Sequence, residues 1–157
     1  MNPDLEFLSQ ELSHVEERAR KLPWAKTRPW KTSSHIWLEH SLPTIDFHDL
    51  GQSLAKEVLD TIVRATDHLE TGAVMLITGS GRHSLGKHGV IKTLVDEHLH
   101  ELTQQRDWEF SPRGPARFIL VFDRDRAPPS ATGRLGWGFW VITLIFLAAL
   151  LTALLVD

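Results

Sequence analysis

Residues 73–84 read AVMLITGSGRHS, an apolar run followed directly by a glycine-containing loop. The run over 73–77 is short and rich in β-forming side chains, so it predicts a buried strand. Beyond the loop, apolar residues recur at helical spacing over 89–102, which predicts a helix. Glycines let a backbone approach an anionic ligand closely, and a helix N-terminus supplies free N–H groups and a partial positive charge. The stretch therefore predicts a strand, a turn suited to an anion and a helix.

The rest of the central region continues this alternation. Strands that alternate with helices predict an α/β layer fold with right-handed crossovers. Strands are expected at 44–48, 73–78 and 117–122, helices at 54–69 and 89–103, and a short extended piece at 108–110.

A second polar motif, IDFHDL at 45–50, lies inside the first expected strand. Asp46 and His48 are two residues apart, so on a strand they share a face. They stand near the carboxyl end of the strand, where α/β folds place their sites. A carboxylate beside an imidazole can orient the ring for proton transfer. The alternative is a structural pair that caps the helix at 54–69 or bonds to the loop.

Together, IDFHDL at 45–50 and TGSGRHS at 78–84 resemble the hallmarks of the Smr (small MutS-related) family, an LDLHG-type strand motif and a TGxGxHS-type loop. The resemblance covers about residues 42–124. It implies a compact two-layer α/β domain, similar to the C-terminal domain of translation initiation factor three. Smr domains are associated with nuclease activity, and the resemblance makes Asp46 and His48 the catalytic residues.

The loop is expected to hold a phosphate backbone. Backbone N–H groups, two hydroxyls and two cations would surround the phosphate, and His83 could bond the phosphate or a 2′-OH. The alternative is a βα turn with solvated side chains. The candidate nucleic-acid-binding residues are Thr78, Gly79, Ser80, Gly81, Arg82, His83, Ser84 and Lys87.

One position departs from the family pattern, since Asp49 stands where the family has glycine. Asp49 could cap the following helix. It could also place a second negative charge beside His48 and repel a phosphate. The second reading favours a domain that binds nucleic acid without cleaving it.

Other chemistries have weaker support. Residues 81–88 satisfy GxxxxGK, but His88 stands where a nucleotide-binding loop needs Ser or Thr for Mg²⁺, so nucleotide hydrolysis is rejected. The chain has no cysteine, which excludes disulfides and thiolate chemistry. Its nine histidines show no metal-ligand spacing, and no metal or cofactor is predicted.

The N-terminal region, residues 1–22, is expected to form an amphipathic helix over 3–22. Its apolar residues follow a 3-4-3-4-3 spacing, which is a narrow heptad seam. The helix either docks on the domain or serves as a short coiled coil or partner-binding helix.

Residues 23–41 are expected to be a linker rich in proline, tryptophan and, at its start, basic side chains. Tryptophans among cations could stack single-stranded bases or lie on anionic lipid, although the net charge of the whole chain is −3. A partly packed linker is the alternative.

Residues 135–156 contain no charged side chain, and 22 residues of helix span about 33 Å, enough for a membrane. This segment predicts a transmembrane tail anchor, with residues 125–134 as a tether and a buried helix as the alternative. Arg124, Arg126 and Arg134 precede the segment and only Asp157 follows it, which places residues 1–134 on the cytoplasmic side, at the inner membrane if the cell is bacterial.

The sequence thus predicts an Smr-like domain at 42–124 tethered to a membrane, acting as an endonuclease on RNA, or on DNA, through Asp46 and His48. A metal-free route by attack of the RNA 2′-OH fits these two residues. The alternatives are a non-catalytic nucleic-acid or ribosome-binding module, and a membrane adaptor that recruits a protein, or a second copy, through residues 3–22.

Overall fold

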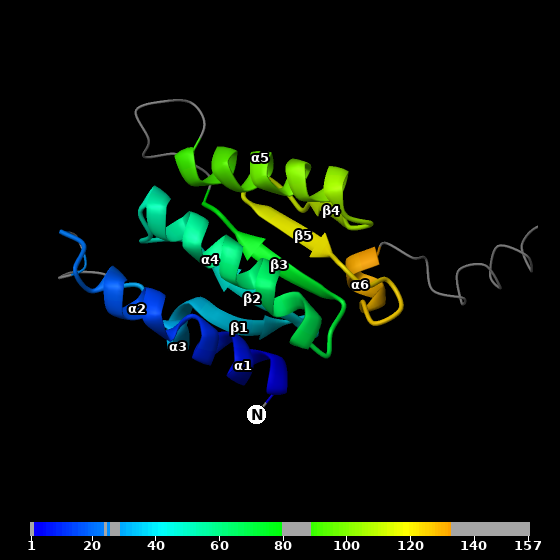
Figure 1. The fold of residues 1–157 in the computed structure, drawn as a ribbon, viewed down its shortest axis with the longest axis horizontal. Coiled ribbons are helices and arrows are strands. Elements are labelled where there is room, and N and C mark those ends of the chain that lie inside the picture. Colours follow the sequence, from blue (N-terminus) through cyan, green and yellow to red (C-terminus); the bar gives the residue numbers. More distant parts are fainter. Residues whose placement is uncertain (1, 24, 26–28, 80–88, 133–157) are drawn as a thin grey trace, which may run out of the picture.

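The computed structural model describes residues 2–23, 25, 29–79 and 89–132 of the chain. Within them the chain folds as a mixed α/β domain with one five-stranded sheet (Figure 1). The elements are α1 (Pro3–Glu11), α2 (Ser13–Ala19), α3 (Thr32–His35), β1 (Ile36–Glu39), β2 (Leu42–Asp46), α4 (Gln52–Ala65), the 3-10 turn η1 (Thr66–His68), β3 (Ala73–Ile77), α5 (Val90–Gln105), β4 (Glu109–Pro112), β5 (Arg117–Val121) and α6 (Pro129–Thr132).

The strand order in the sheet is β1-β2-β3-β5-β4. Among the described strands, only β2 and β3 pair in parallel, and the other three pairs are antiparallel. The three expected strands and two expected helices of the central region are confirmed with small shifts of their ends, and the extended piece expected at 108–110 overlaps the start of β4. An α-helix lies between β2 and β3, as a parallel neighbour requires.

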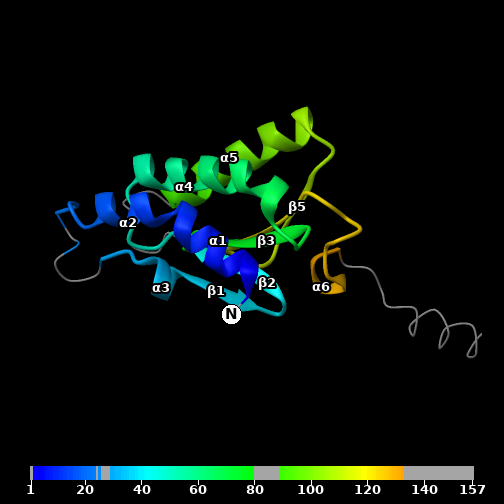
Figure 2. The same ribbon diagram turned by 60° about the horizontal axis from the view of Figure 1, so that its bottom comes forward.

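The helices α1, α2, α4 and α5 contribute to one core on the same face of the sheet (Figures 1 and 2). Alternate residues of the strands point into this core, among them Ile45, Leu76 and Leu120. The opposite face carries a smaller apolar cluster in which Met75 and Ile119 pack with Ala131 of α6. The architecture is therefore a helical layer on a sheet, with α6 beneath one end of the second face.

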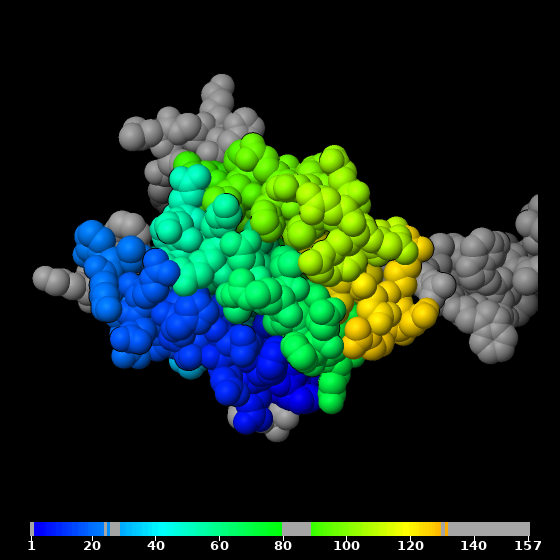
Figure 3. Space-filling model, in the orientation of Figure 1, coloured from blue at the N-terminus to red at the C-terminus, as the bar shows by residue number. Residues whose placement is uncertain are grey.

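The N-terminal helices are part of this core. The seam residues Leu8, Leu12 and Val15 are fully buried, and the helix expected over 3–22 is interrupted at Leu12. The carboxylate of Asp4 accepts hydrogen bonds from the backbone N–H groups of Glu70 (2.7 Å) and Thr71 (3.0 Å). Figure 3 shows the N-terminal residues packed directly against the helical layer. The heptad spacing is thus used to dock the helices on the domain.

The segment expected as a linker, 23–41, differs from that expectation, because it supplies α3, the edge strand β1 and a fully buried Trp30. Strand β1 pairs with β2 through a tight turn in which His40 and Ser41 both have positive φ angles, 51° and 67°. That backbone matches the twist of a two-residue hairpin. The pairing partner, rather than local composition, makes 36–39 a strand.

Among the residues that the structure describes, no helix is both long and apolar enough to cross a membrane. The predicted span at 135–156 lies outside these residues. The described part of the expected tether is not fully extended from the domain, since Ala131 is buried against the sheet.

Candidate functional site

The pair predicted from IDFHDL comes together at the carboxyl end of β2. Oδ1 of Asp46 accepts a hydrogen bond from the backbone N–H of His48 at 2.9 Å and also contacts Nδ1 of the same ring. When Nδ1–H donates to the carboxylate, Nε2 keeps its lone pair and can accept a proton. The side chain of His48 is 53% exposed. The arrangement is that of an oriented general base.

The start of the glycine loop lies against this histidine. A Cβ atom placed on Gly79 would stand 2.8 Å from Nε2 of His48, and Gly79 has a φ angle of +77°. Both facts favour glycine there, because a side chain would displace the ring and strain the backbone. The backbone N–H of Phe47 donates to the carbonyl of Ile77 at 2.8 Å, which carries the β2–β3 pairing up to this point. The two sequence motifs therefore meet at one edge of the sheet.

Thr78 is placed differently from its expected role. Its backbone N–H and its hydroxyl both donate to the carbonyl of Ala116, at 2.8 and 3.2 Å, and the residue is only 6% exposed. Its hydroxyl proton is thus used to tie the end of β3 to the segment before β5. The other predicted phosphate ligands, Ser80, Gly81, Arg82, His83, Ser84 and Lys87, lie outside the described residues.

Two helices begin close to this edge without side-chain caps. The N-caps of α4 and α5 are Gly51 and Gly89, and within the part of the chain that the structure describes no side chain caps either helix and neither first turn contains an acid. By contrast, α1 is capped by Asn2 and has two acids in its first turn. Uncapped N–H groups and the helix dipole favour an anion. This edge of the domain is therefore suited to a phosphate.

Residues of α4 and α5 border a hollow of about 520 Å³. Its lining includes Gln52 and Lys56 from α4, and Val90 and Thr93 from α5.

Asp49 does not cap α4, so that expectation is wrong, since the cap is Gly51. Asp49 instead adopts a left-handed φ of 66° in the turn after β2. Its Oδ2 atom lies 3.9 Å from Nε2 of His35. The positive φ gives a physical reason for a glycine-like position, because Asp is one of the few other residues that tolerate this conformation.

Two residues of the site could not be recognised from its motifs. Trp30 donates its Nε1–H to the carbonyl of Asp46 at 2.7 Å, and its ring lies 5.5 Å from that of His35. Because Trp30 is fully buried, it cannot stack on a nucleic-acid base. The interpretation that the tryptophans of this segment stack bases is therefore wrong for Trp30. Both residues precede β1 and reach the site only through the pairing of β1 with β2.

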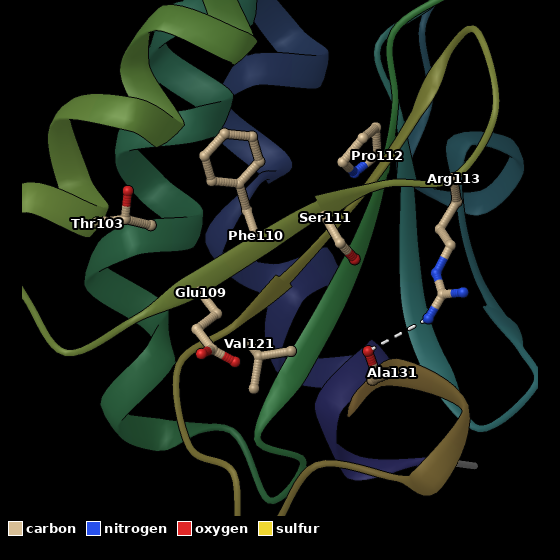
Figure 4. A pocket seen from close by; sticks show the side chains of 8 residues that line it. All are labelled: Thr103, Glu109, Phe110, Ser111, Pro112, Arg113, Val121 and Ala131. Atoms are coloured by element: carbon tan, nitrogen blue, oxygen red, sulfur yellow. Dashed lines mark hydrogen bonds between the residues drawn. The ribbon is translucent and has the colours of Figure 1, made fainter. Parts of the chain in front are cut away.

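Within the described ranges, no group of three or more histidine and carboxylate side chains is placed to hold a metal ion. A further hollow of about 530 Å³ borders β4 and α6 (Figure 4). Arg113 reaches across its rim toward the carbonyl of Ala131 at 3.5 Å. None of the residues predicted for the site lines it.

Comparison of the chain with models of protein families, with curated proteins and with solved structures found no match.

Proposed function

We propose that the chain is a membrane-tethered, Smr-type endonuclease that cleaves RNA, with Asp46 and His48 as its catalytic residues. The observation that carries the proposal is the contact of His48 with Gly79, which joins the two family-like motifs in one place. The helical layer on a mixed sheet supports it further, because the resemblance implies a two-layer α/β domain. The uncapped starts of α4 and α5 give the same edge an affinity for phosphate.

The proposed reaction needs only groups of this chain and the RNA. Nε2 of His48 removes the proton of the 2′-OH, and Asp46 holds the ring and stabilises its positive charge. The 2′ oxygen then attacks the neighbouring phosphorus and the bond to the 5′ oxygen breaks. The proton passes to that oxygen, leaving a 2′,3′-cyclic phosphate and a 5′-hydroxyl. DNA lacks the 2′-OH and is not cleaved by this route.

The membrane attachment belongs to the same proposal. The uncharged segment 135–156 would anchor the chain, and residues 1–134 would face the cytoplasm, at the inner membrane in a bacterium. The substrate would then be RNA that reaches the membrane surface, ribosome-bound RNA included.

A second candidate is a binding module without cleavage, which would hold nucleic acid or a ribosome at the membrane. The carboxylate of Asp49 favours it, because a negative charge in the turn beside His48 opposes the approach of a phosphate.

A cleavage assay separates the two. The full chain, purified in mild detergent, is incubated with labelled single-stranded RNA and DNA with and without EDTA. We compare wild type with His48→Ala and Asp46→Asn, and with His40→Ala as a control at the far end of β1. EDTA-resistant RNA cleavage that is lost in both site variants and kept in the control supports the nuclease. Salt-sensitive binding without cleavage by wild type supports the binding module, and neither binding nor cleavage rejects both.

A further inference from the structure

The segment that precedes β1 contacts both ends of the turn that carries His48. At one end of the turn, the indole N–H of Trp30 donates to the carbonyl of Asp46 at 2.7 Å. At the other end, Nε2 of His35 faces Oδ2 of Asp49 at 3.9 Å. Between these two points stand Phe47 and His48. Neither Trp30 nor His35 belongs to the motifs that define the proposed active site.

The ring of His35 is itself firmly placed. Its side chain is 13% exposed and packs near the indole of Trp30, with 5.5 Å between ring centroids. Its Nδ1 atom lies 3.1 Å from the backbone N–H and 3.0 Å from the carbonyl oxygen of Lys31. A neutral ring can accept from the first and a protonated ring can donate to the second, so either form has a partner. Nε2 carries a proton in both forms, but only the protonated ring balances the charge of Asp49, because 3.9 Å is an ion-pair distance and not a hydrogen bond.

We propose that His35 is a positioning residue for the proposed nuclease site. When its ring is protonated, His35 pairs with the carboxylate of Asp49. The pair holds the end of the turn that presents His48 to Gly79, and it offsets a negative charge that would oppose a phosphate. The expected effect on RNA binding rests on the proposed function, whereas the expected effect on the contact between His48 and Gly79 does not. The group that binds is still the RNA phosphate, and His35 affects its binding through Asp49.

Binding tests the charge role. The probe is a single-stranded RNA with 2′-O-methyl groups, which keeps the phosphates and removes the nucleophile, and the protein is the full chain in detergent. We expect His35→Ala to weaken binding about tenfold, the scale of one unscreened charge contact. Asp49→Asn in the same background should restore binding, because the repelling charge is gone. His35→Gln, whose amide carries no charge, should weaken binding as His35→Ala does.

Unchanged binding in His35→Ala would overturn the inference, and so would a double variant as weak as the single one. A merely structural histidine would not be rescued by Asp49→Asn. His40→Ala serves as the matched control, because His40 lies in the β1–β2 turn, at the opposite end of β1, and its side chain is 76% exposed.

A second measurement does not depend on RNA. In the ligand-free protein with labelled histidine, we expect a nuclear Overhauser contact between the His48 ring and the Gly79 α-protons. The contact should persist in His40→Ala and vanish in His35→Ala. Its persistence in His35→Ala would overturn the positioning role. If wild type neither binds nor cleaves RNA, the proposed function fails, and this contact alone decides the inference.

Discussion

Nε2 of His48 lies so close to Gly79 that a Cβ atom on the glycine would stand 2.8 Å from it. The contact joins two segments that are about thirty residues apart in the chain. Gly79→Ala should therefore displace the imidazole and strain a backbone whose φ is +77°. We expect RNA cleavage to fall about 100-fold or more, the usual effect of moving a catalytic group by an ångström.

Measurements of the stability of the same variant separate the displacement of the ring from the strain of the backbone. Gly79→Ala should lower the free energy of unfolding by about 1–2 kcal/mol through backbone strain, with a further loss from the collision. In a His48→Ala background only the backbone strain should remain. Urea titrations of wild type, the two single variants and the double variant measure the difference. An equal cost in both backgrounds would mean that the ring and the glycine do not touch.

Asp49 should be replaceable only by residues that accept a left-handed backbone. Asp49→Asn keeps that tolerance, so we expect a free energy of unfolding close to wild type. Asp49→Ala, at a φ of 66°, should cost about 1 kcal/mol. Thermal unfolding of the two variants measures the difference, and a stability of Asp49→Ala equal to that of Asp49→Asn would speak against the observed turn.

The N-terminal helices should be indispensable to the domain. Leu12 is fully buried in the main core, so Leu12→Ala should lower the free energy of unfolding by about 2–5 kcal/mol. Leu38→Ala is the matched control, because Leu38 is 43% exposed and should cost less than about 1 kcal/mol. Similar costs in urea denaturation would show that residues 3–19 are an appendage.

Acid should destabilise the fold partly through Glu16. Burial opposes its ionisation, but hydrogen bonds from the Thr32 backbone N–H, the Arg20 side chain and the Thr32 hydroxyl outweigh burial and hold the pKa of Glu16 below its ordinary value of 4.5. A carboxyl with a lowered pKa in the folded state stabilises it above the unfolded pKa, and this contribution disappears as pH falls through the folded pKa.

The midpoint of thermal unfolding should therefore fall between pH 5 and pH 3 less steeply in Glu16→Gln than in wild type. Glu11→Gln, at an exposed position of α1, is the control and should follow wild type. Parallel curves for wild type and Glu16→Gln would show that the contact with Thr32 carries no ionic stabilisation.

The sequence predicted the elements whose signals are local. Val74 and Leu76 belong to a short apolar run, and the run is β3; periodic apolar residues gave α4 and α5. Strand β1 was missed because Ile36 and Trp37 follow prolines and bases, and they become a strand only by pairing with β2. The expected crossovers imply parallel strand pairs, but three of the four pairs among the described strands are antiparallel.

In the site, too, contacts with local signals were predictable and contacts that depend on long-range pairing were not. Asp46 and His48 were expected to share a face of one strand. Strand β2 instead ends at Asp46, and the two residues meet through the turn, in which the His48 N–H donates to Asp46. The family-like motifs indicated that the loop after β3 would join them. The contribution of His35 had no local signal, because its partner Asp49 is brought to it by the hairpin of β1 and β2. Long-range pairing determines such a contact, and single-sequence patterns do not contain it.

The strand order also has a consequence for synthesis of the chain. Among the described strands, β5 is the last to leave the ribosome, yet it lies inside the sheet between β3 and β4. Until residue 121 has been translated, β4 has no neighbour and the edge of β3 is open. The fold is therefore completed late in translation, and nascent chains that stop before β5 would expose sheet edges to aggregation or to chaperones.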